Sequence, residues 1–303
     1  MKYSKILFVL AITASTVMPA QDEKAPDSLG LPGDHFDLFG ALELFKSATS
    51  LEEFEKKLNE ESGEVNNLDL NEDGKVDYVR VIDNMDGEAH AIILQVPVNE
   101  SESQDVAAIE IEKTGAETAN LQIVGDEELY GADYVVEPTD AKASSGSQNW
   151  SDVKNFSRLH VVMNVWFWPP VRFIYAPGYR VWVSPWRWAV YPVWWTPWRP
   201  VAWHVHHKRV IRYHHHFYYG HHRRMVRAHA VYVHHRKTSP VVHQRNAPRH
   251  QARAAHPGSR QPAVKKGGGQ KGKAQPGRTK AKAGAKPGPK GGGGKGGGKG
   301  GRK

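Results

Sequence analysis

Hydrophobic and polar positions follow a helical period in HFDLFGALELFKSA, residues 35 to 48. One face of this segment carries Phe36, Phe39, Leu42 and Phe45. The opposite face carries Asp37, Gly40, Glu43 and Ser47. This spacing predicts an amphipathic helix that buries its aromatic face.

A second helix is expected directly after the first. Ser50 followed by Glu53 is the signature of a capping box, in which each side chain satisfies a free backbone N–H group. An apolar stripe then continues through Leu51, Phe54 and Leu58. Ser62 and Gly63 are expected to end this helix, so the domain begins with a pair of helices.

The period then changes to two, which is typical of half-buried strands. In HAIILQVPV the positions on one face are His90, Ile92, Leu94, Val96 and Val98, and in DVAAIEIEK they are Ala107, Ile109 and Ile111. LQIV at 121–124 predicts a further strand, and Asp86-Gly87 and Thr114-Gly115 predict turns. The expected fold class is therefore α+β, with two N-terminal helices packed on a small antiparallel sheet. We expect His90 to be a hydrogen-bonded histidine of the core or its rim.

LDLNEDGKVDYV, residues 68 to 79, has the ligand order of a calcium-binding loop. The candidate ligands are Asp69, Asn71, Asp73, the backbone carbonyl of Lys75, and Asp77, with Gly74 at the sharp turn. Position twelve, where an EF-hand has a glutamate, is Arg80, which cannot ligate a cation. The loop resembles the calcium loops of FG-GAP repeats and of EF-hands, which implies calcium as the ion.

Two alternatives to a calcium site remain open at this stage. The first is a turn without a metal, because Asx residues and glycine form such turns readily. The second is magnesium, which is less favoured because it needs a tighter octahedral shell of ligands. If KVDYVRVI, residues 75 to 82, forms a strand, Asp77 shares a face with Val79 and Val81 while Arg80 points away. The loop would then join two strands, and Asp77 would close the site.

The composition changes completely after a polar linker at 139–150. The ten tryptophans lie between Trp150 and Trp203, where several prolines exclude a long helix. Ala176-Pro177-Gly178 predicts a turn between VRFIY and YRVWV, so one short hairpin is expected. Otherwise the region 151–260 is expected to have little regular structure. Interleaved Trp and Arg suit a surface that stacks on sugars, bases or aromatic partners, although the tryptophans would equally well pack on each other or cover the sheet.

Histidine is concentrated in the same region. Of the 17 histidines, 14 lie between His204 and His256, and such tracts are typical of zinc, nickel or copper binding. A second, less specific metal region is therefore assigned to His204, His206, His207, His214, His215, His216, His221 and His222. The alternative is a pH-tunable charge, because imidazoles titrate near ~6.5.

Charge divides the chain into two halves. Residues 21–140 contain 31 Asp and Glu against 7 Lys and Arg, a net charge of −24, whereas residues 141–303 contain one acid, Asp152, against 32 Lys and Arg, a net charge of +31. Residues 261–303 are Gly- and Lys-rich and are expected to form a disordered cationic tail. The expected partners are lipid A, acidic polysaccharide, extracellular DNA or the protein's own acidic half. Intracellular nucleic acid is a less favoured partner.

The N-terminal residues 1–20 have the build of a secretory signal peptide, with Lys2 and Lys5 ahead of a short apolar run that ends at Ala20. The expected location is therefore periplasmic, outer-membrane-associated or extracellular, with no transmembrane helix in the mature chain. Cysteine is absent, which excludes disulfides and thiolate sites. No G-x-S-x-G, H-E-x-x-H or Walker motif occurs, so an enzyme is not expected.

Five segments resemble uncharacterised secreted proteins of Bacteroidota-type bacteria: LDLNEDGKVDYVRVID, QVPVNESESQDVAAIEIEKTG, GDEELYG, VVEP and YRVWVSPWRW. The resemblance covers residues 50–200 and implies export and a two-part layout without assigning an activity. The expected organisation is a signal peptide (1–20), a linker (21–33), an acidic domain (34–138), a linker (139–150), a basic region (151–260) and a tail (261–303). The predicted function is that of a non-catalytic, exported, calcium-binding and envelope-associated binding or structural protein, whose basic half contacts envelope polyanions or its own acidic domain. The alternative is sequestration of zinc, nickel or copper by the histidines.

Overall fold

The computed structural model describes residues 28–138, 162–220 and 222–255. The chain divides into two units, Met1–Pro262 and Ala263–Lys303, and all described residues belong to the first. The expected signal peptide, the 139–150 linker and the cationic tail lie outside the described residues, as does His221. No helix in the described part of the chain has the length and apolar character needed to cross a bilayer.

The N-terminal segment forms the two predicted helices. A 3-10 helix η1 (Pro32–His35) precedes α1 (Leu38–Ser47), which begins later than the sequence suggested because Asp37 caps it by accepting a hydrogen bond from the N–H of Gly40. Gly40 was expected on the polar face but is buried. A Cβ atom there would lie 2.6 Å from Cγ2 of Val65, so the helix packs closely on the segment that follows α2.

The second helix, α2 (Leu51–Leu58), uses half of the predicted capping box. The Ser50 side chain accepts from the N–H of Glu53 at 3.2 Å. The Glu53 carboxylate instead accepts from the N–H of Thr49 at 2.8 Å, one residue earlier than a capping box requires. The helix ends at Leu58 and is followed by a 3-10 helix, η2 (Glu61–Gly63), so Ser62 and Gly63 end the helical segment as a whole.

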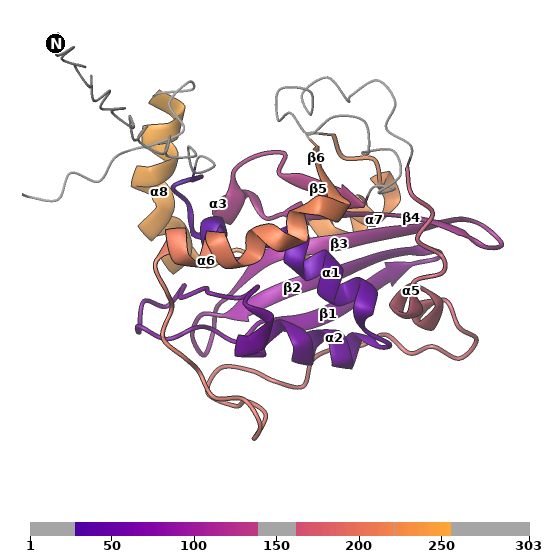
Figure 1. The fold of residues 1–303 in the computed structure, drawn as a ribbon, viewed down its shortest axis with the longest axis horizontal. Coiled ribbons are helices and arrows are strands. Elements are labelled where there is room, and N and C mark those ends of the chain that lie inside the picture. The colour runs from indigo at the N-terminus through magenta and orange to yellow at the C-terminus, as the bar shows by residue number, and fades with distance from the viewer. Residues whose placement is uncertain (1–27, 139–161, 221, 256–303) are drawn as a thin grey trace, which may run out of the picture. The chain divides into compact units, whose positions relative to one another are not determined.

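One antiparallel sheet organises the described residues (Figure 1). Its strands follow one another in sequence order: β1 (Arg80–Asp86), β2 (Ala89–Pro97), β3 (Ser103–Gly115), β4 (Thr118–Gly125), β5 (Val135–Pro138) and β6 (Phe217–Gly220). A short helix, α3 (Glu127–Tyr130), connects β4 to β5. A mixed fold of helices and antiparallel sheet was predicted and is confirmed. The last strand comes from the basic half, which was not predicted.

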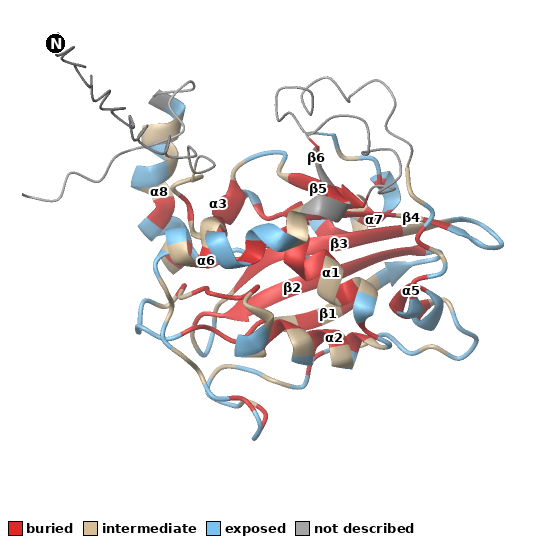
Figure 2. Cartoon of the chain, in the orientation of Figure 1, coloured by how far each residue is buried: buried red, intermediate tan, exposed pale blue. Residues whose placement is uncertain are grey.

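Both faces of the sheet are covered, although the alternation of the strands suggested that one face would be open. One face packs on α1 and α2 through residues such as Ile92 and Leu94. The other face packs through Ala91 and Ile93 on Tyr232 of α7 (Val226–His235). Every position of β2 is therefore buried, as Figure 2 shows in red. The run AHAIILQVP is the signature of such a doubly covered strand.

The expectation of little regular structure in the basic region is wrong for residues 203–255. These residues form α6 (Trp203–Val210), a 3-10 helix η4 (Ile211–His216), β6, α7 and α8 (Pro240–Ala255). In α7, Ala228, Val231 and Tyr232 recur at helical spacing and contact the sheet, a stripe that the abundance of His and Arg conceals.

The hairpin expected around Pro177 is also absent, because the VRFIY segment is helical. Pro169 and Pro170 start α5 (Pro169–Ile174), where a missing N–H group costs no hydrogen bond. Residues 179–200 contain no helix or strand, as expected, and their extended backbone is interrupted by turns at 188–189 and 193–194. Their backbone bonds to the outer edge of β1, with the Asp83 N–H donating to the Trp182 carbonyl and the Ser184 N–H to the Val81 carbonyl. This edge strand is thereby shielded.

The two halves of the chain share one hydrophobic core. Trp168, Val171 and Ile174 of the basic half, with Phe217 and Val242, are buried in the same cluster as the aromatic face of α1. This arrangement places the charged residues of the basic half against those of the acidic half.

Candidate functional site

The calcium-type loop is a network of side chains that accept hydrogen bonds from its own backbone. The N–H groups of Asp73 and Gly74 donate to the Asp69 carboxylate at 3.1 and 3.0 Å. The Asp73 N–H also donates to Asn71, and the Lys75 N–H donates to Asp73. Gly74 has φ +79°, the left-handed conformation that glycine adopts most easily. These bonds hold the loop in a turn whether or not a cation is present.

Asp77 differs from the other predicted ligands because it is buried. Only 6 % of its surface is exposed, and its carboxylate accepts a hydrogen bond from the N–H of Leu70. The pKa of Asp77 is raised to about 7, mainly by burial; the charges of Asp69 and Asp73 also raise it, and the hydrogen bond from Leu70 lowers it. A cation at this position would relieve both causes of the raised pKa.

The strand expected to close the loop is shorter than predicted. β1 begins at Arg80, and residues 75–79 are extended without belonging to a strand. The Val76 N–H donates to the carbonyl of Trp198, and the Asp77 N–H donates to Leu68. The loop therefore does not join two strands. Trp198 of the basic half supplies the backbone carbonyl for Val76 that a neighbouring strand would have supplied.

Part of the predicted histidine region gathers against the N-terminal helices. His206 and His207 lie on α6, and the rings of His207 and His214 are 6.0 Å apart. Nε2 of His214 lies 2.8 Å from Oδ1 of Asp37, and its ring stacks on Phe39. His204 and His222 are exposed and do not join this group among the described residues, and the structure does not describe the side chains of His215, His216 and His221.

Burial dominates the chemistry of this histidine group. It lowers the pKa of His206 to about 4, and it also lowers the pKa values of His207 and of His35, a histidine that the sequence reasoning missed. Nε2 of His206 and Nε2 of His207 are buried without a hydrogen-bond partner. His35 lies about 170 residues before α6 in the chain, so no spacing in the sequence indicated that it would join the group.

Across residues 28–138, 162–220 and 222–255, no set of three or more His, Asp or Glu side chains is arranged to hold a metal ion. The oxygen donors of the loop suit calcium by type, and the imidazoles suit zinc, nickel or copper by type. In the calcium-type loop and in the histidine group, the described side chains have suitable donor atoms and lie near one another, but they do not converge on a single metal position.

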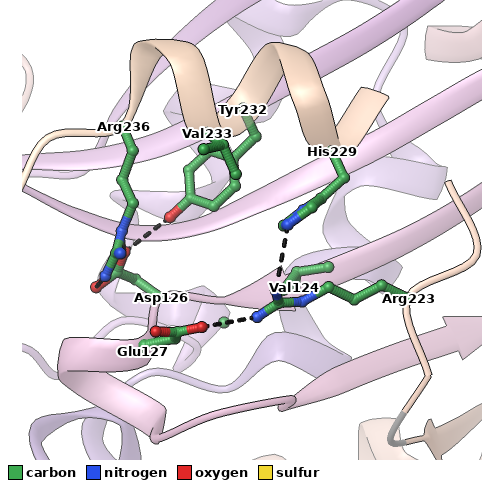
Figure 3. A pocket seen from close by; sticks show the side chains of 9 residues that line it. Val124, Asp126, Glu127, Arg223, His229, Tyr232, Val233 and Arg236 are labelled. Carbon is green, nitrogen blue, oxygen red and sulfur yellow. Dashed lines mark hydrogen bonds and ion pairs between the residues drawn. The ribbon is translucent and has the colours of Figure 1, made fainter. Parts of the chain in front are cut away.

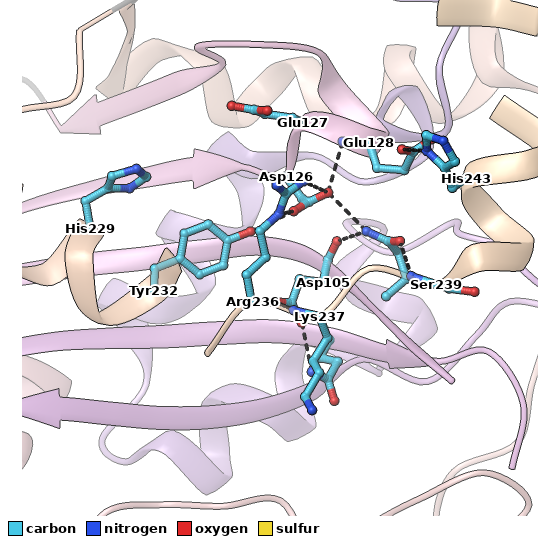
Figure 4. Close-up of polar contacts among 12 residues, drawn as sticks. Asp105, Asp126, Glu127, Glu128, His229, Tyr232, Arg236, Lys237, Ser239 and His243 are labelled. Carbon is cyan, nitrogen blue, oxygen red and sulfur yellow. Dashed lines mark hydrogen bonds and ion pairs between the residues drawn. The ribbon is translucent and has the colours of Figure 1, made fainter. Parts of the chain in front are cut away.

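A third polar group lies where α7 and α8 meet the ends of β3 and β4 (Figure 4). Asp126 accepts hydrogen bonds from Nε of Arg236 at 2.6 Å, from the Tyr232 hydroxyl at 2.8 Å and from Gln104 at 3.0 Å. Asp105 accepts from Gln95 and from the N–H of Lys237, both at 2.8 Å. Burial raises the pKa of Asp105 to about 7, against the opposing effect of the Gln95 bond.

A small cavity adjoins this network (Figure 3). It has a volume of about 40 Å³ and is lined by Asp126, Glu127, Arg223, His229, Tyr232 and Arg236, among others. Such a volume accommodates a water molecule or two and no organic substrate. Because its carboxylates already accept bonds from Arg and Tyr, the network joins elements together and does not present a reactive group.

A larger hollow lies between α3 and α8, with a volume of about 470 Å³. The Glu128 carboxylate lies there between two histidines, 2.7 Å from Nδ1 of His243 and 3.3 Å from Nε2 of His250. These contacts fasten α8 to α3 and add to the attachment of the basic half.

Ion pairs across the two halves involve one set of arginines, here called the paired arginines: Arg209, Arg212, Arg223, Arg224, Arg227, Arg236 and Arg245. Each lies within 4.0 Å of a carboxylate of the acidic half. The shortest pair is Arg236 with Asp126, and the Arg212–Glu64 pair measures 2.7 Å. The paired arginines come from α6, η4, α7, α8 and the connections between them, the part of the basic half that is folded into helices.

A second set, here called the unpaired arginines, consists of the arginines within residues 166–199: Arg172, Arg180, Arg187 and Arg199. All four are exposed, and within the described residues none forms an ion pair. They lie among exposed apolar side chains: Phe167, Phe173, Val181, Val183, Val190, Val193 and Trp194. We call residues 166–199 the aromatic–arginine segment. Its Trp/Arg composition was recognised in the sequence, but the separation of the arginines into two sets was not.

Comparison with known proteins adds no relative: no family model, no curated protein and no solved structure matches this chain.

Proposed function

We propose that this chain is an exported, non-catalytic binding protein of the cell envelope, in which the helical part of the basic half is docked on the acidic half and the aromatic–arginine segment contacts anionic partners. The observation that carries the proposal is the environment of the four unpaired arginines. They are exposed, lack a carboxylate partner within the described residues and alternate with exposed aromatic and aliphatic side chains.

The chemistry of this surface favours phosphate, sulfate or carboxylate groups as ligands. Arginine binds such groups through two parallel N–H bonds, and neighbouring aromatic rings stack on sugars or cover apolar parts of the ligand. Asp152 is the one acid in residues 141–303. Glu55 and Asp83, which lie under the segment, are buried and hydrogen-bonded, so they do not compete for the arginines.

Two observations favour binding over catalysis. The Asp126 cavity is too small for a substrate, and its charged groups are paired with one another. The buried acid–histidine pair Asp83–His90 is covered by Tyr175 and Tyr179, with the Tyr179 hydroxyl donating to Asp83 at 2.8 Å. Acid–base groups are thus present, but they are hydrogen-bonded inside the fold.

The proposal is tested by retention of the full chain on an immobilised sulfated polysaccharide. The double variant Arg180→Gln/Arg187→Gln is compared with Arg224→Gln/Arg227→Gln, which removes the same charge from two paired arginines. We expect the first variant to elute at lower salt than the second, because only the first loses groups that are free to bind. Equal elution of the two variants would contradict the proposal and would assign binding to net charge alone.

A second candidate function is transition-metal sequestration, favoured by the two buried Nε2 atoms of His206 and His207 that lack a partner. Neutral imidazoles of this kind bind zinc, nickel or copper after a small rearrangement of the rings. Zinc titration of the full chain is the test, with His206→Ala/His207→Ala compared with His234→Ala/His235→Ala on α7. Equal zinc binding by both variants would exclude a specific role for the α6 histidines.

We also propose that calcium stabilises the loop at Asp69, Asn71, Asp73, Lys75 and Asp77. The support is the donor chemistry and the raised pKa of the buried Asp77 beside two further carboxylates. The ion would neutralise these charges and add stability to the acidic half without taking part in the binding of the anionic partner.

A further inference from the structure

The aromatic–arginine segment is fixed to the rest of the protein along one side. Its backbone bonds to β1 through Trp182 and Ser184 and to Val76 through Trp198. Figure 1 shows it passing along β1 and α2 on its way from α5 to α6, at the sheet edge opposite β6. A segment held in this way presents the same side chains outward in every molecule.

The inward side chains of the segment are satisfied by the acidic half. The Trp182 Nε1–H donates to Glu55 at 3.1 Å, and the Ser184 hydroxyl donates to the same carboxylate at 2.7 Å. The ring of Trp195 packs edge-on against Tyr78 at 5.2 Å between centroids. These contacts account for the packing of the inner side, but they give no reason for the apolar character of the outer side.

The outward side chains are large and apolar. Val193 is fully exposed, Phe167 is 65 % exposed, and Val183 and Trp194 are about half exposed. Figure 2 shows this part of the chain mostly in pale blue and tan. A folded chain gains nothing by placing such groups in water, so the surface suits a partner that removes them from it.

The identity of the partner follows from the combination of exposed valines with unpaired arginines. A hydrophilic polyanion contacts arginine and stacks on tryptophan, but it offers nothing to Val183, Val190 or Val193. An anionic bilayer offers phosphates to Arg180 and Arg187 and an acyl boundary to the apolar side chains between them. Tryptophan also prefers the bilayer interface, because its ring is apolar and its N–H group is polar.

We propose that the aromatic–arginine segment seats on the surface of a bilayer that contains anionic phospholipid, with Val193 and Trp194 entering the headgroup region and the unpaired arginines on phosphates. This inference rests on the proposed function and names the partner of the same surface. Because the segment is tied to β1, the acidic half is held at the membrane by a rigid connection.

The test uses the full chain with vesicles of phosphatidylcholine alone and with phosphatidylcholine and phosphatidylglycerol mixed three to one. Binding is measured by flotation and by the blue shift of tryptophan fluorescence. Eight of the ten tryptophans lie within residues 166–199, so their emission reports on this segment. Val193→Asp is compared with Val226→Asp, a matched change at a valine of α7 that is 75 % exposed.

We expect wild type and Val226→Asp to float with the anionic vesicles, to show a blue shift and to remain bound at about 0.5 M salt, where surface charges are screened within ~5 Å. Val193→Asp is expected to bind at least about fivefold more weakly, because a charge is costly in the headgroup region. Equal binding by the two variants, or release of the wild type by salt, would overturn the proposal.

The outcomes separate this inference from the proposed function. If the wild type is retained on the sulfated polysaccharide through Arg180 and Arg187 but ignores both kinds of vesicle, the membrane proposal fails and the proposed function stands. If the wild type binds neither the polysaccharide nor the vesicles, both fail. A blue shift with anionic vesicles that is absent with phosphatidylcholine alone, and lost in Val193→Asp, supports both.

Discussion

The paired and the unpaired arginines belong to the same basic half but have opposite environments. Arg236 donates to the fully buried carboxylate of Asp126, whereas Arg187 has no ionic partner in the described residues. The first set is used to attach α6, α7 and α8 to the acidic half. The second set lies in the aromatic–arginine segment, where the exposed neighbours are apolar. Net charge alone therefore does not identify a binding surface, because part of it is consumed within the fold.

The two sets also differ in the acids they face. Arg236 and Arg224 meet the buried carboxylates of Asp126 and Glu137, where an unpaired charge is costly, whereas Arg245 meets the exposed carboxylate of Glu72. Beneath the aromatic–arginine segment, the carboxylate of Glu55 is already bonded by Tyr78, Trp182 and Ser184. Burial raises the pKa of Glu55, and these hydrogen bonds oppose the rise. A carboxylate satisfied by neutral donors does not need an arginine as its partner.

The most severe test of this contrast removes one arginine from each set. Arg236→Met leaves Asp126 buried without its guanidinium, and we expect it to lower the free energy of unfolding by roughly 3 to 5 kcal/mol. Arg187→Met should change it by no more than about 0.5 kcal/mol. Urea unfolding followed by circular dichroism measures both. Similar losses for the two variants would mean that the arginines do not divide as described.

Acid stability sharpens the comparison, because the basic half buries Asp105 as well as supplying charge. Its pKa is about 7 in the folded protein and 3.8 in an unfolded chain, so the folded state holds the proton more tightly. The contribution of this group to stability is thus full below pH 3.8 and is lost as the pH rises through 7. As the pH rises from 3.8 to 7, the free energy of unfolding of Asp105→Asn should therefore increase relative to that of wild type by roughly 2 to 4 kcal/mol.

This prediction is checked by chemical unfolding of both proteins at several pH values. The difference between the two curves is the informative quantity, because other groups also make stability depend on pH. Asp77 changes the stability in the same direction as Asp105, and His206 changes it in the opposite direction. The lowered pKa of His206 makes the wild type less stable as the pH falls from 6.5 to about 4. Parallel curves for wild type and Asp105→Asn would contradict the assignment to Asp105.

A third test examines how closely the docked part of the basic half fits. A Cβ atom at Gly40 would lie 2.6 Å from Val65 and 2.9 Å from the ring of Tyr213 in η4. We expect Gly40→Ala to lower the thermal midpoint, at a cost of roughly 1 to 3 kcal/mol, despite the better helix propensity of alanine. The double variant Gly40→Ala/Val65→Ala should lose less than the sum of the single variants. If the stability losses of the two single variants were strictly additive, the added methyl group at position 40 would not be crowded by Val65.

Calcium binding to the loop of the acidic half should have a smaller effect on stability. At ten times its dissociation constant, calcium should stabilise the full chain by about 1.4 kcal/mol. Thermal melting with calcium, magnesium and EDTA should show a calcium-specific rise that Asp73→Ala abolishes, with Asp86→Ala as a control outside the loop. An unchanged midpoint in all three solutions would make the loop a metal-free Asx turn.

The smallest effect on stability is expected at the unpaired arginines, where the effect on binding of the polysaccharide is largest. Arg180→Gln/Arg187→Gln should melt within a degree or two of wild type, because surface substitutions away from buried partners rarely exceed about 0.5 kcal/mol. The same variant is expected to lose retention on the sulfated polysaccharide. A large fall in its melting temperature would show that the segment's arginines stabilise the fold and would remove the contrast between the two sets.

The sequence by itself determined the elements that depend on neighbouring residues. The aromatic face of α1, the apolar stripe of α2 and the alternation in β2 and β3 were readable because each pattern repeats within a few positions. The charge separation between the halves and the turn at Gly74 were readable for the same reason. These features were sufficient to indicate a mixed fold with an antiparallel sheet.

Tertiary structure decided which side chains meet across the chain. β6 pairs with β5 from about 80 residues away, and α7 covers the second face of the sheet with a stripe of only three residues. His35 joins the histidines of α6, and Arg236 reaches Asp126 about 110 residues earlier. No local pattern encodes such contacts, because they depend on how separate elements pack and on which charges become buried when they do.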